Sequence, residues 1–122
     1  MEPLISAMPA IVAVALFGLG AKTVFAPTSM LDNFGIDPRG PVGLNTLRGV
    51  IGGLFFGATA MLVSGLATED PTWFFAAAQL LTAVAAGRLL GLAVDGFEKT
   101  VIPPLVLETV MIAILVGAYV NG

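Results

Sequence analysis

The sequence predicts an all-α integral membrane protein that folds as a four-helix up-down bundle. Of its 122 residues, 57% are hydrophobic and only 11% are charged, whereas about a quarter of the residues in soluble domains are charged. The mean hydropathy of +1.00 leaves too few polar side chains to cover a water-soluble globule. Four apolar stretches are each long enough to cross a hydrocarbon core of about 30 Å. We therefore expect one transmembrane domain over residues 1–122.

The expected helices cover four residue ranges: about 3–25, 44–66, 71–94 and 102–120. In the first range only Ser6 and Lys22 are clearly polar, and Lys22 is close enough to the end to reach the headgroups. The second, third and fourth ranges are joined by short turns, which predicts an up-down-up-down order.

The connection between the first and second helices, residues 26–43, is the only long one. Its prolines and glycines are expected to prevent a continuous helix: Pro27, Gly35, Pro38, Gly40 and Pro41. We expect a short helical segment at the membrane interface. A lid over a polar site is the alternative.

The distribution of charge predicts the orientation. The basic residues all lie in or near the loops 26–43 and 95–101: Lys22, Arg39, Arg48, Arg88 and Lys99. The opposite side carries Glu2, Glu69 and Asp70 but no lysine or arginine. By the positive-inside rule, the two loops are cytoplasmic and both termini are outside.

Three ionisable residues lie inside the expected spans at similar depth, each on a different helix: Arg48, Arg88 and Glu108. A charge in a bilayer costs at least about 2.5–3.5 kcal/mol, so mutual pairing is more economical than three separate exposures. We expect Glu108 to accept hydrogen bonds from one or both guanidinium groups. Asn45 and Asp95 lie at the edge of this buried Arg-Glu-Arg layer, near the cytoplasmic face.

Three interpretations of the layer stay open. It can fix the register of the helices and hold the bundle together, and we give this interpretation the most weight. It can also bind an amphipathic anion, a lipid headgroup or a quinone-like carbonyl, which the excess of arginine favours. In the third interpretation, Glu108 is part of a proton or ion path.

Small residues form two files along the expected helices. Gly49, Gly53 and Gly57 make two overlapping G-x-x-x-G units, and Gly87 and Gly91 make another. Such files let helix backbones approach closely in membranes. We expect them to face other helices of the bundle, with an interface between copies of the chain as the alternative.

Composition excludes several classes of function. The chain has no cysteine and no histidine, which removes thiolate sites, disulfides and the commonest general base and metal ligand. The few, scattered basic residues do not suit nucleic acid. We expect no catalytic residue, metal or cofactor. The leading hypothesis is a non-enzymatic accessory subunit of a larger membrane complex, or a homo-oligomer, in contact with membrane lipid. A small transporter or binder of an amphipathic anion is the alternative.

Three motifs together carry a family resemblance: Leu44-Asn-Thr-Leu-Arg-Gly-Val-Ile-Gly-Gly53, Gly87-Arg-Leu-Leu-Gly-Leu-Ala-Val-Asp-Gly96 and Leu107-Glu-Thr-Val110. With the Phe25-Ala-Pro27 exit from the first helix, they resemble a family of small bacterial four-span membrane proteins. That family is known as a domain of unknown function, number forty-three forty-five. The resemblance covers nearly the whole chain and implies the fold and a multi-pass location in the bacterial inner membrane. It implies no activity.

Overall fold

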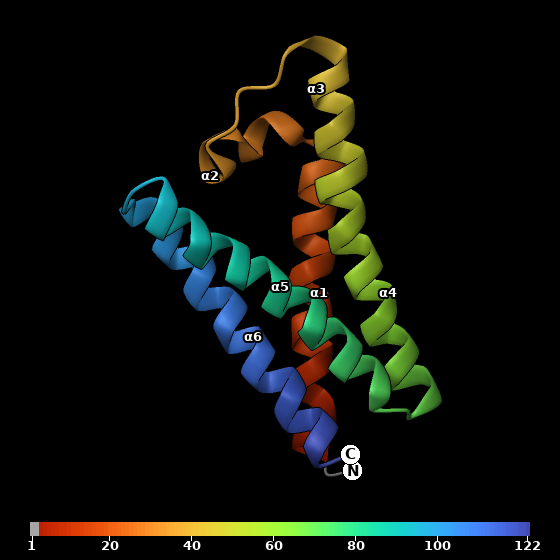
Figure 1. Cartoon of the computed structure of the whole chain (residues 1–122). Helices are drawn as coiled ribbons and strands as arrows, with labels where there is room; N and C mark the ends of the chain where they lie inside the picture. Colours follow the sequence, from red (N-terminus) through yellow and green to blue (C-terminus); the bar gives the residue numbers. More distant parts are fainter. Residues whose placement is uncertain (1–2) are drawn as a thin grey trace. The chain divides into compact units, whose positions relative to one another are not determined.

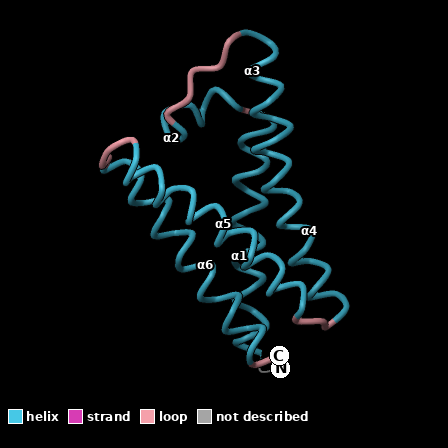
Figure 2. Tube along the Cα trace, viewed as in Figure 1, coloured by secondary structure: helices cyan, strands magenta, loops and turns pink. Residues whose placement is uncertain are grey.

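The computed structural model describes residues 3–122, with side-chain surroundings from residue 7 onward. Over this range the chain is helical between short turns and contains no strand (Figure 2), which confirms the all-α prediction. Four of its helices are long and apolar enough to cross a membrane. Glu2, part of the predicted acidic side, lies outside the described residues.

Three of the long helices are continuous: α1 (Pro3–Phe25), α5 (Thr72–Val94) and α6 (Ile102–Val120). The second span is assembled from α3 (Gly40–Thr46), the π-helical η2 (Leu47–Gly52) and α4 (Gly53–Thr68). It begins at Gly40 rather than near residue 44, because Pro41 lies in the first turn of α3, where a missing amide hydrogen breaks no helical hydrogen bond. The chain between α1 and α3 is not a continuous helix, as predicted.

Three short elements complete the chain: η1 (Pro27–Met30), α2 (Leu31–Phe34) and η3 (Lys99–Val101). The predicted helical turn between the first two spans corresponds to η1 and α2, and Pro27 opens it. α2 ends because Gly35 adopts a φ of 64°, and its amide donates back to the Leu31 carbonyl at 2.8 Å, a left-handed ending that glycine favours.

The described helices group into two compact units. The first unit comprises residues 1–10 and 61–122, and the second comprises residues 11–60. Figure 1 labels the helices of both. The single transmembrane domain stays a prediction, and each unit is described by itself below.

In the first unit, α5 and α6 pack side by side along their length (Figures 1 and 2). Their buried residues recur every three or four positions: Phe74, Ala77, Ala78, Leu81 and Ala85 on α5, and Glu108, Met111, Leu115 and Ala118 on α6. This spacing gives each helix one buried face. Near the opposite end from the α5–α6 turn, the rings of Phe75 and Tyr119 stack with centroids 4.8 Å apart.

In the second unit, α1 and the composite span approach closely through glycine. A Cβ at Gly52 would lie 2.5 Å from Cγ2 of Val24, and one at Gly20 would lie 2.8 Å from the Phe56 ring. The rings of Phe17 and Phe56 are 5.5 Å apart. The absence of a side chain at these glycines thus lets the two helix backbones approach closely. Between membrane helices, such close van der Waals packing drives association in place of the hydrophobic effect.

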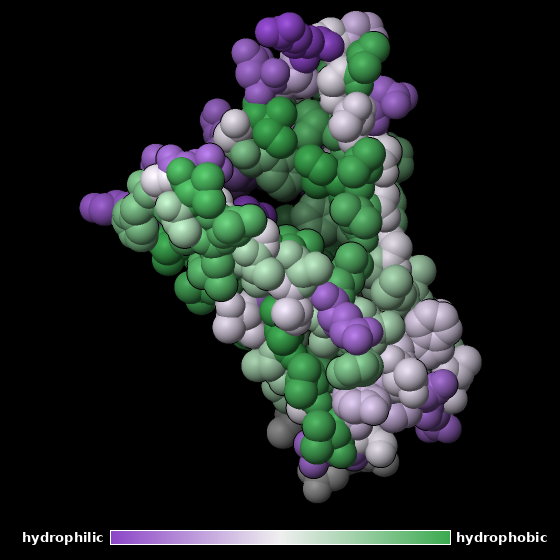
Figure 3. Space-filling model, in the orientation of Figure 1, coloured by the Kyte–Doolittle hydropathy of each residue, from purple (hydrophilic) through white to green (hydrophobic). Residues whose placement is uncertain are grey.

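Polar groups inside the helices are satisfied locally. Six threonine hydroxyls donate to the carbonyl four residues earlier, at 2.6–3.0 Å: Thr23, Thr46, Thr59, Thr68, Thr82 and Thr109. In hydrocarbon an unpaired hydroxyl has no water to bond, so this back-bonding suits a membrane helix. Figure 3 shows hydrophobic side chains over much of one face, with many of the hydrophilic ones at the turns and a smaller hydrophilic patch between them.

Candidate functional site

An ion pair joins α5 to α6. Nε of Arg88 donates to Oε1 of Glu108 at 2.7 Å. The Glu108 side chain is 9% exposed and that of Arg88 is 33% exposed, so the carboxylate is buried while the guanidinium reaches the surface. The structure thereby brings together two of the three predicted buried charges, Arg88 and Glu108, which are 20 residues apart in the sequence.

Both members of the pair keep unused hydrogen-bonding capacity. Oε2 of Glu108 is buried and has no hydrogen-bond partner among the described residues. The hydrogen bond between the two side chains uses Nε of Arg88, and it leaves the two terminal nitrogens of the guanidinium out of the contact. A buried acceptor without a donor is costly. The fork of a guanidinium can hold a second oxygen-bearing group at its terminal nitrogens while Nε is engaged.

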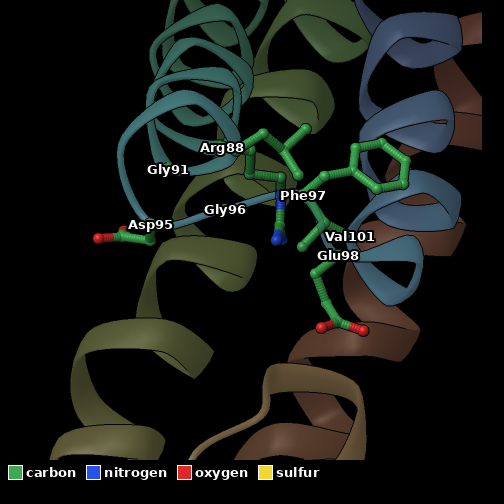
Figure 4. Close-up of a pocket in the computed structure, with 8 residues that line it drawn as sticks. Arg88, Gly91, Asp95, Gly96, Phe97, Glu98 and Val101 are labelled. Carbon is green, nitrogen blue, oxygen red and sulfur yellow. The ribbon is translucent and has the colours of Figure 1, made fainter.

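A cavity of about 370 Å³ opens beside Arg88. It is formed by one stretch of chain, from the last turns of α5 through the following turn to η3: Arg88, Gly91, Leu92, Asp95, Gly96, Phe97, Glu98 and Val101. In Figure 4 the guanidinium of Arg88 and the carboxylate of Glu98 both point downward, whereas the carboxylate of Asp95 points away from them, to the left. The cavity therefore combines one cation, one nearby carboxylate and an apolar wall.

The turn that forms the cavity is set by the end of α5. The amide of Asp95 donates to the Gly91 carbonyl at 2.8 Å, and Gly96 then adopts a φ of 108°. That conformation is strained for any residue with a side chain, so glycine here turns the chain away from the helix axis. The same turn carries Phe97 and Glu98 to the cavity.

Arg48 is held differently, within the second unit. Its NH1 donates to the carbonyl of Val24 at 2.7 Å, in the last turn of α1, where carbonyls lack partners within the helix. Arg48 is the second residue of the π-helical η2. A cation at a helix C-terminus also interacts favourably with the helix dipole.

The shared Arg-Glu-Arg layer requires Glu108 of the first unit to accept from Arg48 of the second, and it stays a prediction. Asn45 is exposed on α3, and Asp95 is exposed at the end of α5. Of the predicted residues, Arg88, Gly91 and Asp95 line the cavity. The other lining residues were not predicted, although their position in or beside the Gly-Arg-x-x-Gly-x-x-x-Asp-Gly string was the available signal: Leu92, Gly96, Phe97, Glu98 and Val101.

The predicted glycine files make no helix contact within their units. A Cβ at Gly49, Gly53, Gly57 or Gly87 would meet nothing within 4 Å, and one at Gly91 would meet only Oδ2 of Asp95 at 3.8 Å. The close approaches instead use Gly20, Gly52 and Gly65, where a Cβ would lie 2.5–2.8 Å from a neighbouring side chain.

Comparison with known families decides the classification. The family described as "Domain of unknown function (DUF4345)" matches residues 6–119. The chain belongs to this family. The matched range contains Arg48, Arg88, Glu108 and both glycine files, and the resemblance seen in the sequence is confirmed. No curated protein and no solved structure matched the chain.

Proposed function

We propose that the protein is a non-enzymatic, multi-pass membrane protein that binds the polar end of an amphipathic molecule in the cavity beside Arg88. The observation that supports this is that only one side of the Arg88 guanidinium forms a hydrogen bond with Glu108. Its Nε is bonded to Glu108, and the rest of the group borders a cavity of about 370 Å³. Ligand sites of about 300–1,000 Å³ are typical of proteins.

The chemistry of the lining favours an oxygen-bearing polar group with an apolar neighbour. A guanidinium held at one edge offers parallel N–H donors to a phosphate, carboxylate or carbonyl. Leu92, Phe97 and Val101 supply the apolar surface. The lining contains no serine, threonine or lysine, and the chain has no histidine or cysteine, which supports a binding role over catalysis.

The proposal includes an orientation in the bacterial inner membrane, with both termini outside and the cavity on the cytoplasmic side. It rests on the positive-inside rule and on the basic residues near the loops 26–43 and 95–101. Because the chain has no cysteine, single cysteines at residues 69 and 99 give an unambiguous test. An impermeant maleimide should label residue 69 in intact cells and residue 99 only after lysis, and the reverse pattern would refute the orientation.

The structural role is the second candidate, as an accessory subunit or homo-oligomer. It is favoured by the glycine file Gly49, Gly53 and Gly57, which has no neighbour within 4 Å in its own unit. Membrane helices associate through such small-residue faces. A second copy of the chain or a helix of a larger complex would then supply the missing contact.

Native mass spectrometry of the gently extracted protein tests the binding role. The wild-type chain should retain an amphipathic molecule, and the double variant Arg88→Gln/Glu108→Gln should retain it at least about ten-fold less, because a charge-assisted hydrogen bond is lost. The double variant removes both charges, so no buried ion is left unpaired. Arg39→Gln is the control, since it removes an arginine outside the cavity.

Two outcomes contradict the binding role: a wild-type spectrum without a retained molecule, or equal retention in the double variant. The same spectra report the oligomeric state. A defined oligomer without ligand would support the structural role instead.

A further inference from the structure

The opening of the Arg88 cavity carries both signs of charge. Arg88 is already paired with Glu108, so the ion pair as a whole has no excess positive charge to offer. Glu98 adds a carboxylate whose direction matches that of the Arg88 guanidinium (Figure 4), and it forms no ion pair among the described residues. A purely anionic ligand at Arg88 would therefore lie near an unpaired negative charge.

An anion in this position would be repelled by Glu98, whereas a ligand with both charges would pair with each side chain. Opposite charges within a few ångströms attract and like charges repel, and both effects strengthen away from bulk water. The excess of arginine that favoured a simple anion in the sequence depends on Arg48, which belongs to the other unit and bonds to the carbonyl of Val24.

We propose that the occupant is a zwitterionic phosphate ester with a primary ammonium group, as in the headgroup of an ethanolamine phospholipid. Its phosphate contacts the terminal nitrogens of Arg88 and its ammonium contacts the carboxylate of Glu98. This inference rests on the proposed binding function of the same cavity and specifies the ligand.

A primary ammonium suits Glu98 because it donates hydrogen bonds to a carboxylate, which a quaternary ammonium cannot do. Quaternary ammonium groups are recognised by cages of several aromatic rings, and Phe97 is the only aromatic residue in the lining. The chemistry thus favours an ethanolamine headgroup over a choline headgroup.

The surroundings of the cavity favour a lipid over a free phosphate ester. Three large apolar side chains of α5 are exposed beside the lining residues: Leu89 is 55% exposed, Leu90 is 64% exposed and Val94 is 71% exposed. Acyl chains that leave the cavity can lie along this surface. The volume of about 370 Å³ is at the small end of ligand sites, which suits a headgroup with its chains outside.

The test uses the full chain in nanodiscs and three phospholipids with the same acyl chains: ethanolamine, choline and glycerol headgroups. Bound lipid is measured by native mass spectrometry for the wild type, Glu98→Gln and Asp37→Asn. Each variant removes one negative charge, but Asp37 lies outside the lining of the cavity, whereas the carboxylate of Glu98 points the same way as the Arg88 guanidinium (Figure 4). The wild type should prefer the ethanolamine lipid over the glycerol lipid by roughly ten-fold, the scale of one charge-assisted hydrogen bond.

Glu98→Gln should abolish that preference, and Asp37→Asn should keep it. An unchanged preference in Glu98→Gln, an equal loss in both variants, or a wild-type preference for the choline or glycerol lipid would overturn the proposal. Competition by soluble phosphoethanolamine as effective as that by the lipid would overturn the lipid source. Retention of a different amphiphile, lost in Arg88→Gln/Glu108→Gln, would leave the binding function standing, whereas no retained molecule would refute both.

Discussion

Each of the two units holds an arginine of a helix that is long and apolar enough to cross a membrane, and they do so in different ways. In the first unit, Arg88 on α5 pairs with the carboxylate of Glu108 on α6 at 2.7 Å. In the second, Arg48 bonds to a main-chain carbonyl, that of Val24 at the end of α1, also at 2.7 Å. The distances are equal, but only the first contact neutralises the charge. A carbonyl offers a partial charge, so Arg48 keeps its net positive charge.

This difference has a consequence for where each arginine can lie. A neutralised pair tolerates burial, whereas a cation with only a dipolar partner must stay near water or headgroups. The span that carries Arg48 is 29 residues long, Gly40–Thr68, or about 43 Å at 1.5 Å per residue. This exceeds a hydrocarbon core of about 30 Å, so the ends of the span can extend into the interface and Arg48 can be close to it.

The largest effect should come from breaking the ion pair in one member only. Arg88→Gln leaves a buried carboxylate without its partner and should lower the free energy of unfolding by about 3 kcal/mol. This is the low end for buried pairs, because the Arg88 side chain is 33% exposed. Unfolding in mixed micelles can be followed by fluorescence of Trp73, the single tryptophan.

The control for this prediction is the double variant Arg88→Gln/Glu108→Gln. It should recover most of the lost stability, to within about 1 kcal/mol of the wild type, because no unpaired charge is left. A double-mutant cycle with no coupling energy would show that the two side chains do not interact.

The helices could be predicted from the sequence because their signal is local. Length and apolar composition suffice to define a span, and α6 covers Ile102–Val120, as expected for residues 102–120. The composite second span was harder. Proline fits a first helical turn as well as a loop, so Pro41 alone does not indicate where the span begins, and no propensity indicates that Leu47–Gly52 is π-helical.

The next largest effect should separate two adjacent glycines of the second unit. Gly52→Ala places a methyl group 2.5 Å from Cγ2 of Val24 and should destabilise the unit by about 1–3 kcal/mol, as overpacking does. Gly53→Ala meets nothing within 4 Å and should be neutral or stabilising by up to about 1 kcal/mol, since alanine favours a helix. The same unfolding measurement in micelles checks both.

Gly53→Ala also bears on the structural candidate. If copies of the chain associate through Gly49, Gly53 and Gly57, this variant should lower the oligomer fraction while it leaves monomer stability unchanged or raised. Equal destabilisation by the two substitutions would contradict the close approach at Gly52.

The candidate site was only partly predictable, for a physical reason. Arg88 and Glu108 carry opposite charges at the same expected depth, so their contact can be predicted from the sequence. The acceptor of Arg48 cannot be predicted in this way, because every residue has a main-chain carbonyl. The carbonyl of Val24 is available only because α1 ends there. The close approach at Gly52 was not predicted for a related reason: a spacing of four indicates a small face but not which glycine lies against a neighbouring helix. The packing of Gly49, Gly53 and Gly57 against other helices stays a prediction.

The smallest effect concerns Arg48. Arg48→Gln replaces a charged donor to the Val24 carbonyl by a neutral one and should cost about 0.5–1 kcal/mol, the value of a cation at a helix end. Arg48→Lys keeps the charge and one donor and should cost less, although a lysine cannot reproduce the planar fork. Hydrogen exchange at the amides of the last turn of α1 should rise in Arg48→Gln and stay near wild type in Arg48→Lys. A loss of 3 kcal/mol or more would mean that Arg48 holds a neutralising partner such as Glu108, and the contrast between the two arginines would then disappear.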